Sequence, residues 1–145
     1  MSPYKKILIA TDGSLQTGKA VKQGIELAKL LDAKLYVVFV IDTSAFDFFS
    51  VDTAVEKAHD LLREKGEKIT GAVEEMAKEN DVDVRSEVLV GQPAIEIVNF
   101  AEEGNIDLIV MGTLGKAGIE RFLLGSVSEK VIRTSPVPVM VVRNR

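Results

Sequence analysis

Three glycines and a serine in the second half of this 145-residue chain have types and a spacing suited to phosphate binding. They form the pattern G-x2-G-x9-G-S and are Gly112, Gly115, Gly125 and Ser126. Glycine lacks a Cβ atom, so a ligand can approach its backbone closely. Each residue alone has an ordinary alternative, because glycines make turns and serines cap helices. The complete spacing, between an apolar run and a helix, favours a phosphate site.

The helix that follows this motif supplies further hydrogen-bond donors. Residues 126–129 read S-x-x-E, a capping box that predicts a helix with Ser126 as its N-cap. The N–H groups of Val127 and Ser128 then point out of the helix end, where the helix dipole favours an anion. One hydroxyl and several N–H groups in one place predict a cradle for phosphate.

A second candidate lies near the N-terminus, where residues 13–20 read G-x-x-x-x-G-K-A. A phosphate loop needs a hydroxyl after the lysine to bind Mg²⁺, and Ala20 has none. The fourth apolar run also lacks the acid that such proteins place at a strand end. We expect a helix to begin near Ser14, which puts Gly18 and Lys19 in its early turns. The match is therefore interpreted as accidental.

Short apolar runs alternate with helical periodicity along the chain. The predicted strands are 6–10, 35–41, 82–90, 106–111 and 137–142. The predicted helices are 14–31, 54–80, one from Pro93 to a cap at Gly104, and one from 126 that ends at Ser135-Pro136. This order predicts one α/β domain, 1–145, with a five-stranded parallel doubly wound sheet, helices on both faces and a Rossmann-like arrangement.

The longest predicted helix, 54–80, has one apolar and one charged face. The residues expected to point inward are Leu61, Leu62, Ile69, Val73 and Met76. The loop before it carries Phe46, Phe48 and Phe49, for which a mobile lid, a dimer contact and local packing remain three open interpretations.

The ends of the strands indicate where a ligand binds. In an open doubly wound sheet, ligands lie beyond the carboxyl ends of the strands, where the strand order switches, and we expect that switch beside the first strand. The residues that follow the strands are Thr11-Asp12-Gly13, Asp42, Gly91 and Gly112. The first and fourth of these loops are the richest in glycine and polar residues.

Pro138 lies in the last predicted strand, 137–142. Proline has no N–H group to donate to a neighbouring strand, so this strand is expected at an edge of the sheet. An apolar edge must be covered or paired. Pairing with the same strand of a second copy predicts a two-fold homodimer.

Composition excludes several classes of function. The net charge is −4, which disfavours nucleic-acid binding. No cysteine is present, so disulfides and Cys-ligated zinc are excluded, and the single His59 cannot build a multi-histidine metal site. No apolar run reaches membrane-spanning length, and the apolar part of the N-terminus is short for a signal peptide. A cytoplasmic protein without membrane contact is expected.

Residues 111–142, "MGTLGKAGIERFLLGSVSEKVIRTSPVPVMVV", resemble the C-terminal signature of the universal stress protein family, in its ATP-binding branch. The motif G-x2-G-x9-G-[ST] of that branch is met in full. "KILIATDGS" resembles the family's first strand and acidic turn, "VFVID" its second strand, and "VLVGQPAIEIV" its third strand and next helix. The resemblance covers nearly the whole chain.

The resemblance implies a fold like that of the adenine nucleotide alpha hydrolases, with ATP in the cleft and Mg²⁺ or Mn²⁺ carried on its phosphates. It implies that Asp12 lies near the ribose or the adenine edge beside Ala10 and Thr11, and that Val40 meets the adenine. The ribose and phosphate path is implied for Met111 and Gly112. The resemblance also implies that the phosphates are held by Gly115, Gly125, Ser126, Val127 and Ser128.

The function implied is that of a dimeric, nucleotide-dependent regulator or sensor in a stress response, with ADP or AMP as other candidate ligands and a further protein partner left open. Two alternatives remain, a slow ATPase and a structural dimer without nucleotide. Hydrolysis needs a base for the attacking water and cations for the transferred charge. Asp12 is the only obvious acid near the cleft, and it is assigned to the nucleoside. Slow or absent turnover is therefore expected, with no catalytic residue and no protein ligand for a metal.

Overall fold

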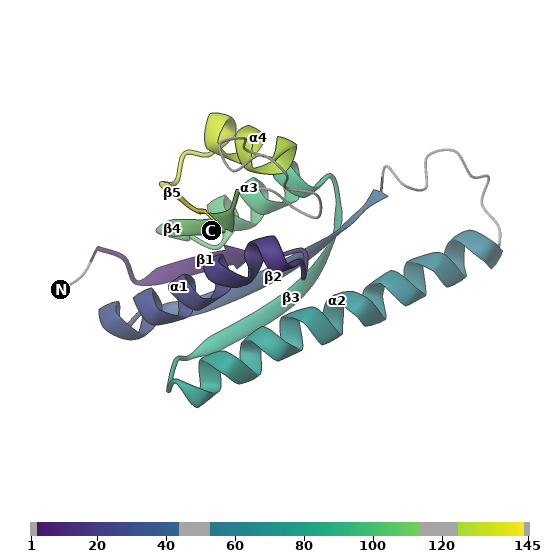
Figure 1. The fold of residues 1–145 in the computed structure, drawn as a ribbon. Coiled ribbons are helices and arrows are strands. Elements are labelled where there is room, and N and C mark those ends of the chain that lie inside the picture. The colour runs from purple at the N-terminus through teal and green to yellow at the C-terminus, as the bar shows by residue number, and fades with distance from the viewer. Residues whose placement is uncertain (1–2, 44–52, 114–124, 144–145) are drawn as a thin grey trace.

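The computed structural model describes residues 3–43, 53–113 and 125–143. Strands and helices alternate along these ranges (Figure 1) as β1 Lys6–Ala10, α1 Leu15–Leu31, β2 Lys34–Asp42, α2 Thr53–Glu79, β3 Val84–Gly91, α3 Pro93–Glu103, β4 Leu108–Gly112, α4 Ser126–Thr134 and β5 Val139–Val142. The strands pair in parallel in the order β3-β2-β1-β4-β5. The predicted five-stranded parallel sheet of an α/β fold is confirmed.

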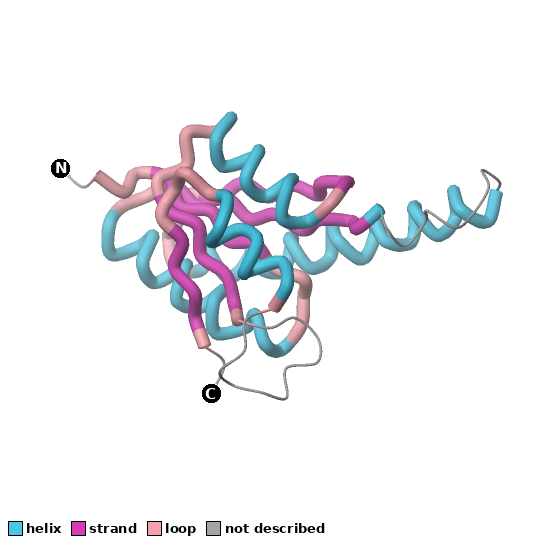
Figure 2. Tube along the Cα trace, turned by 90° about the horizontal axis from the view of Figure 1, so that it is seen from above, coloured by secondary structure: helices cyan, strands magenta, loops and turns pink. Residues whose placement is uncertain are grey.

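Helices cover both faces of this sheet (Figures 1 and 2). α1 and α2 pack on one face, over Ile7, Ile9 and Val37, while α3 and α4 pack on the other, over Leu8 and Val38. Successive residues of a strand point to opposite faces, so a strand covered on both sides must be apolar throughout. This explains why β1 is a continuous apolar run without alternation.

The strand order switches beside β1, as predicted. The chain runs outward from β1 to β2 and β3, and then returns to place β4 on the other side of β1. α1 leaves β1 toward one face, and α4 follows β4 on the opposite face. In such sheets the carboxyl ends of the two strands at the switch form the ligand crevice.

β5 lies at an edge of the sheet, as the position of Pro138 predicts, and β3 forms the other edge. The strand begins at Val139 rather than at Val137. A tight turn occupies the residues before it, because the Ser135 hydroxyl donates to the Val137 carbonyl (2.7 Å) and accepts from its N–H group (2.9 Å). The carbonyl of Pro138 still accepts a hydrogen bond from Ile109 N (2.9 Å).

α2 is the longest helix of the described residues, and its first turns extend beyond the ends of the strands in both views (Figures 1 and 2). Val73 is buried against the sheet, whereas Leu61 is 66% exposed, so the prediction that Leu61 faces inward was wrong. Neighbouring helical residues point about 100° apart. Leu62 takes the inward direction, and Leu61 is turned to solvent.

Two glycines in α2 differ in what surrounds them. A Cβ atom added at Gly66 would lie 2.7 Å from Cδ1 of the buried Phe39, whereas one added at Gly71 would meet nothing within 4 Å. We expect Gly66→Ala to destabilise the protein by about 1–2 kcal/mol through overpacking. Gly71→Ala should stabilise it by about 0.5–1 kcal/mol, because alanine favours the helix. Urea unfolding of both variants checks this prediction. It would be contradicted if both substitutions changed the free energy of unfolding in the same direction.

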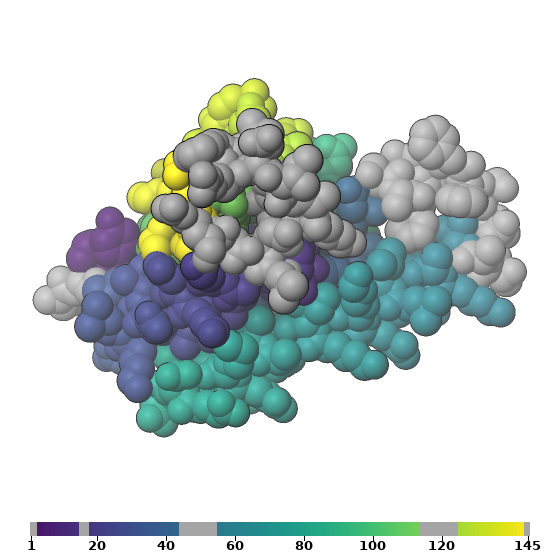
Figure 3. All heavy atoms as spheres, viewed as in Figure 1, coloured from purple at the N-terminus to yellow at the C-terminus, as the bar shows by residue number. Residues whose placement is uncertain are grey.

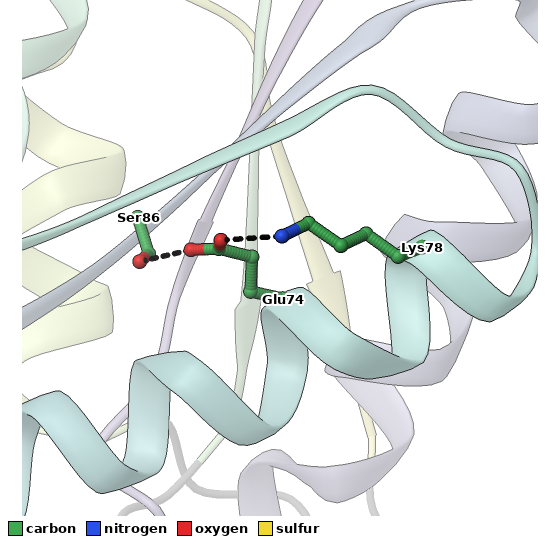
Figure 4. Close-up of polar contacts among 3 residues, drawn as sticks. All are labelled: Glu74, Lys78 and Ser86. Atoms are coloured by element: carbon green, nitrogen blue, oxygen red, sulfur yellow. Dashed lines mark hydrogen bonds and ion pairs between the residues drawn. The ribbon is translucent and has the colours of Figure 1, made fainter.

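A small polar cluster joins α2 to β3 (Figure 4). The Ser86 hydroxyl donates to Glu74 Oε2 (2.6 Å), and Lys78 Nζ lies 3.1 Å from Glu74 Oε1. The hydrogen bond from Ser86, and then the contact with Lys78, lower the pKa of the Glu74 carboxyl below its ordinary value of 4.5. Both partners favour the charged carboxylate.

This lowered pKa predicts a pH-dependent contribution to folding. Because Glu74 binds its proton less tightly in the folded state than in the unfolded state, it contributes stability above about pH 4.5, and the contribution is lost as the pH falls below that value. At pH 7 the variant Glu74→Gln should be less stable than wild type by about 0.5–1 kcal/mol. Urea titrations at pH 7 and pH 3 should show this difference shrinking. A constant difference would exclude the charge as its cause.

None of the helices in the described part of the chain combines the length and apolar character needed to cross a membrane.

Candidate functional site

A cavity of about 490 Å³ lies at the carboxyl ends of the strands, over the switch in strand order. Among the described residues, its wall includes ten of the eleven predicted ligand contacts, namely Ala10, Thr11, Asp12, Val40, Met111, Gly112, Gly125, Ser126, Val127 and Ser128. The eleventh, Gly115, falls outside the described residues, as do Phe46, Phe48 and Phe49. Residues about a hundred positions apart in the sequence thus surround one space.

The turn after β1 holds Asp12 at the cavity by local hydrogen bonds. Thr11 N donates to the carbonyl of Val38 in β2 (3.1 Å), and Gly13 N donates to Thr11 Oγ1 (3.1 Å). Asp12 Oδ1 accepts from Ser14 N (2.9 Å). Gly13 has φ +79°, which glycine adopts without strain. This turn directs the chain from the strand into α1 and leaves the Asp12 carboxylate at the cavity wall.

The residues at 13–20 that nearly match a phosphate loop do not form a loop, because most of them belong to α1. Ser14 is the N-cap of α1, so Gly18 and Lys19 lie inside the helix, as predicted. A Cβ atom at Gly18 would meet nothing within 4 Å. In a phosphate loop the backbone wraps around the phosphate, whereas here the same residues form regular helix. Lys19 is exposed and is not part of the described cavity wall.

The N-terminus of α4 opens onto the cavity, but with a different cap from the one predicted. Gly125 is the N-cap, with φ −69° and ψ 159°, Ser126 is the first helical residue, and no side chain caps the helix. The predicted capping box was therefore wrong by one position. The first helical N–H groups have no acceptor within a helix. At this end they belong to Ser126, Val127 and Ser128.

Two hydrogen bonds tie α4 to β4 behind this helix end. Gly125 N donates to the Thr113 carbonyl (2.6 Å), and the Ser128 hydroxyl donates to the Gly112 carbonyl (2.8 Å). Ser128 is only 5% exposed. Its side chain therefore positions α4 on β4, and a contact from Ser128 to a ligand falls to its backbone N–H group.

Several wall residues were not predicted as ligand contacts. They come from β2, α2 and α3 and are Val38, Phe39, Ile41, Asp42, Leu62, Lys65, Pro93 and Ile97. Most are apolar, and in a sequence they are indistinguishable from core residues. Asp42 could have been identified from the sequence as a possible ligand contact, because it is a polar residue that directly follows a predicted strand. No sequence pattern indicates the α2 residues Leu62 and Lys65, since their position depends on how α2 crosses the end of the sheet.

The charges at the described cavity wall are two carboxylates, Asp12 and Asp42, and one ammonium group, Lys65. In the described part of the chain, no group of three or more His, Asp or Glu side chains is placed to hold a metal ion. An apolar wall with a few polar groups and a helix N-terminus suits an organic anion, such as a nucleotide.

Comparison with known proteins identifies the family of this chain. The sequence profile of the universal stress protein family matches residues 3–143. Universal stress protein MJ0531 of Methanocaldococcus jannaschii is 47% identical over 140 residues, 97% of this chain and 82% of that protein. The solved structure of hypothetical protein MJ0577 covers 99% of both chains with a TM-score of 0.90 and 31% identity. A universal stress protein solved in complex with cAMP is 27% identical, with a TM-score of 0.72 over 99% of this chain and all of that one. The chain therefore belongs to the universal stress protein family.

Proposed function

We propose that this protein binds ATP in the cavity at the strand switch and acts as a nucleotide-dependent regulator in a stress response. The observation that carries the proposal is the convergence of β1, β2, β4 and α4 on one cavity, where a carboxylate and a helix N-terminus face the same space. The complex of a universal stress protein with cAMP supports an adenine nucleotide as the class of ligand.

In this proposal the nucleoside lies toward β1 and β2. Val40 and Ile97 offer an apolar surface for the base, and the Asp12 carboxylate accepts hydrogen bonds from the ribose hydroxyls. The phosphates lie toward Gly125 and Ser126, where the first N–H groups of α4 and its dipole stabilise negative charge. Mg²⁺ or Mn²⁺ would be carried on the phosphates and would neutralise part of their charge.

The direct test is to identify the nucleotide that accompanies the purified protein. After denaturation, released small molecules are separated and identified by mass spectrometry, and the emptied protein is titrated with ATP, ADP, AMP and cAMP by calorimetry. We expect ATP to bind in the micromolar range or tighter, at one site per chain. If none of the four nucleotides binds, the proposal is wrong and the structural-dimer alternative is favoured.

Slow or absent hydrolysis is part of the proposal. One oxygen of Asp12 already accepts the Ser14 N–H group, and the proposed ribose contact engages this carboxylate further, so Asp12 is not available as a base for water. A phosphate-release time course on wild type and Gly125→Val tests this. Turnover in wild type that disappears in the variant would instead identify an ATPase.

We also propose a homodimer formed through β5. Among the described strands β5 has a neighbour on one side only, and Val139, Met140 and Val141 are half-buried in a single chain. Pairing with the β5 strand of a second copy would cover them by two-fold symmetry. We expect light scattering to give the mass of a dimer, and Val141→Lys to shift it toward the monomer. A monomeric wild type at high micromolar concentration would contradict the proposal.

A further inference from the structure

One face of α2 forms a wall of the cavity that the glycine motif does not include. Leu62 and Lys65 line the cavity directly. One turn further along, a Cβ atom at Gly66 would press on Phe39, and one at Gly13 would lie 2.5 Å from Ile69 Cδ1. Leu62, Lys65, Gly66 and Ile69 follow the i, i+3, i+4, i+7 spacing of one helix face. This face therefore runs along the end of β2 and the turn that carries Asp12.

Lys65 supplies the only positive charge among the described wall residues. The other charged groups there are the carboxylates of Asp12 and Asp42, so without Lys65 this wall would be purely negative. No described residue forms an ion pair with Lys65. A triphosphate brought beside two carboxylates needs compensating positive charge, and a lysine ammonium group is a mobile point charge suited to phosphate.

Because Lys65 is on the same helix face as Ile69, which meets the Gly13 turn, its stem starts one helical turn from the residues beside Asp12. Lysine side chains lay their apolar stem along apolar surface and extend the ammonium group to its partner. Leu62 and Ile41 provide such a surface at this wall. The stem of Lys65 can therefore lie along this wall, with the ammonium group extended toward the cavity.

We propose that Lys65 is a phosphate-binding residue of this site, which recognises the charge of the nucleotide's phosphate chain from the side opposite α4. This inference rests on the proposed nucleotide binding. It identifies a contact on the second helix, outside the glycine motif and the first-strand turn. It also makes the affinity depend on the number of phosphates, since the attraction grows with the charge of the ligand.

The test is a calorimetric comparison of Lys65→Gln with Lys68→Gln across ATP, ADP, AMP and adenosine. Lys68 is exposed on the same helix and is not part of the described cavity wall, so its variant has the same net charge without the contact. We expect Lys65→Gln to weaken ATP binding about fivefold and adenosine binding less than about twofold, while Lys68→Gln stays within about twofold of wild type for all four ligands. Lys65→Arg should retain most of the affinity for ATP.

The outcomes separate this inference from the function on which it rests. If wild type binds none of the four ligands, the proposed function itself fails. If wild type binds ATP and both glutamine variants behave alike, only the role of Lys65 is wrong. An equal loss for ATP and adenosine would also overturn it, because a phosphate contact cannot act on a ligand without phosphate. Circular dichroism of each variant shows whether α2 is intact.

Discussion

The variant Gly125→Asp should lose at least about 100-fold in ATP affinity while its free energy of unfolding stays the same or rises. Gly125 is the N-cap of α4, and its φ of −69° and ψ of 159° suit an aspartate cap. The new carboxylate would accept the N–H groups of Val127 or Ser128 and would complement the helix dipole. It would thereby occupy the donors assigned to phosphate and repel the ligand. A 100-fold loss corresponds to about 2.7 kcal/mol.

The opposite signs of the two effects make this prediction specific. Binding is measured by calorimetry with ATP, and stability by urea unfolding of the nucleotide-free protein. The control is Gly125→Ala, which adds a methyl group without charge. It should lower stability by about 1 kcal/mol, because alanine is a poor N-cap, and should weaken ATP binding much less than the aspartate does. If Gly125→Asp binds ATP as wild type does, the phosphates do not lie at α4.

The variant Asp12→Ala should weaken ATP binding by about 10- to 100-fold. Hydrogen bonds that involve a charged group contribute about 1.5–3 kcal/mol, and the proposed ribose contact is of this kind. The same carboxylate accepts Ser14 N in the turn before α1 (2.9 Å). Some loss of stability therefore accompanies the substitution, so affinity alone does not separate a ligand contact from a structural role.

Modified ribose separates the two roles. The ligand 2′,3′-dideoxy ATP lacks both ribose hydroxyls and so cannot donate a hydrogen bond to the Asp12 carboxylate. The affinities of wild type and Asp12→Ala for this ligand should therefore differ by less than about threefold. The matched control is Lys19→Ala, at an exposed position outside the described cavity wall, and its ATP affinity should equal that of wild type. A large loss in Lys19→Ala would instead support a phosphate loop at residues 13–20.

The layout of the fold could be read from local patterns. Strands buried on both faces are continuously apolar, so the apolar run of β1 was recognisable as a strand from the sequence. The alternation of such runs with helical periodicity predicted the parallel sheet. Pro138 predicted the edge position of β5 for a similarly local reason, the missing N–H group. The glycine spacing that ends at Gly125 and Ser126 pointed to the residues that line the cavity.

Element ends followed hydrogen bonds that no local pattern specifies. Ser126 has the spacing of a capping box, yet Gly125 is the N-cap, because its N–H group bonds to Thr113 and the extended chain turns into the helix one residue earlier. The start of β5 is set in the same way by the hydrogen bonds of Ser135 with Val137.

The order of the elements, the parallel sheet and the two loops that carry Asp12 and Gly125 follow from the amino-acid sequence alone, because each depends on residue types within a few positions of one another. The side of α2 that faces the cavity depends instead on the packing of distant segments, which places Leu62 and Lys65 at the cavity wall and Leu61 in solvent. The reason is steric. Gly66 lets α2 approach Phe39, and Ile69 meets Gly13, so contacts between distant segments set the rotation of the helix. Figure 3 shows α2 running along the edge of the molecule beside α1.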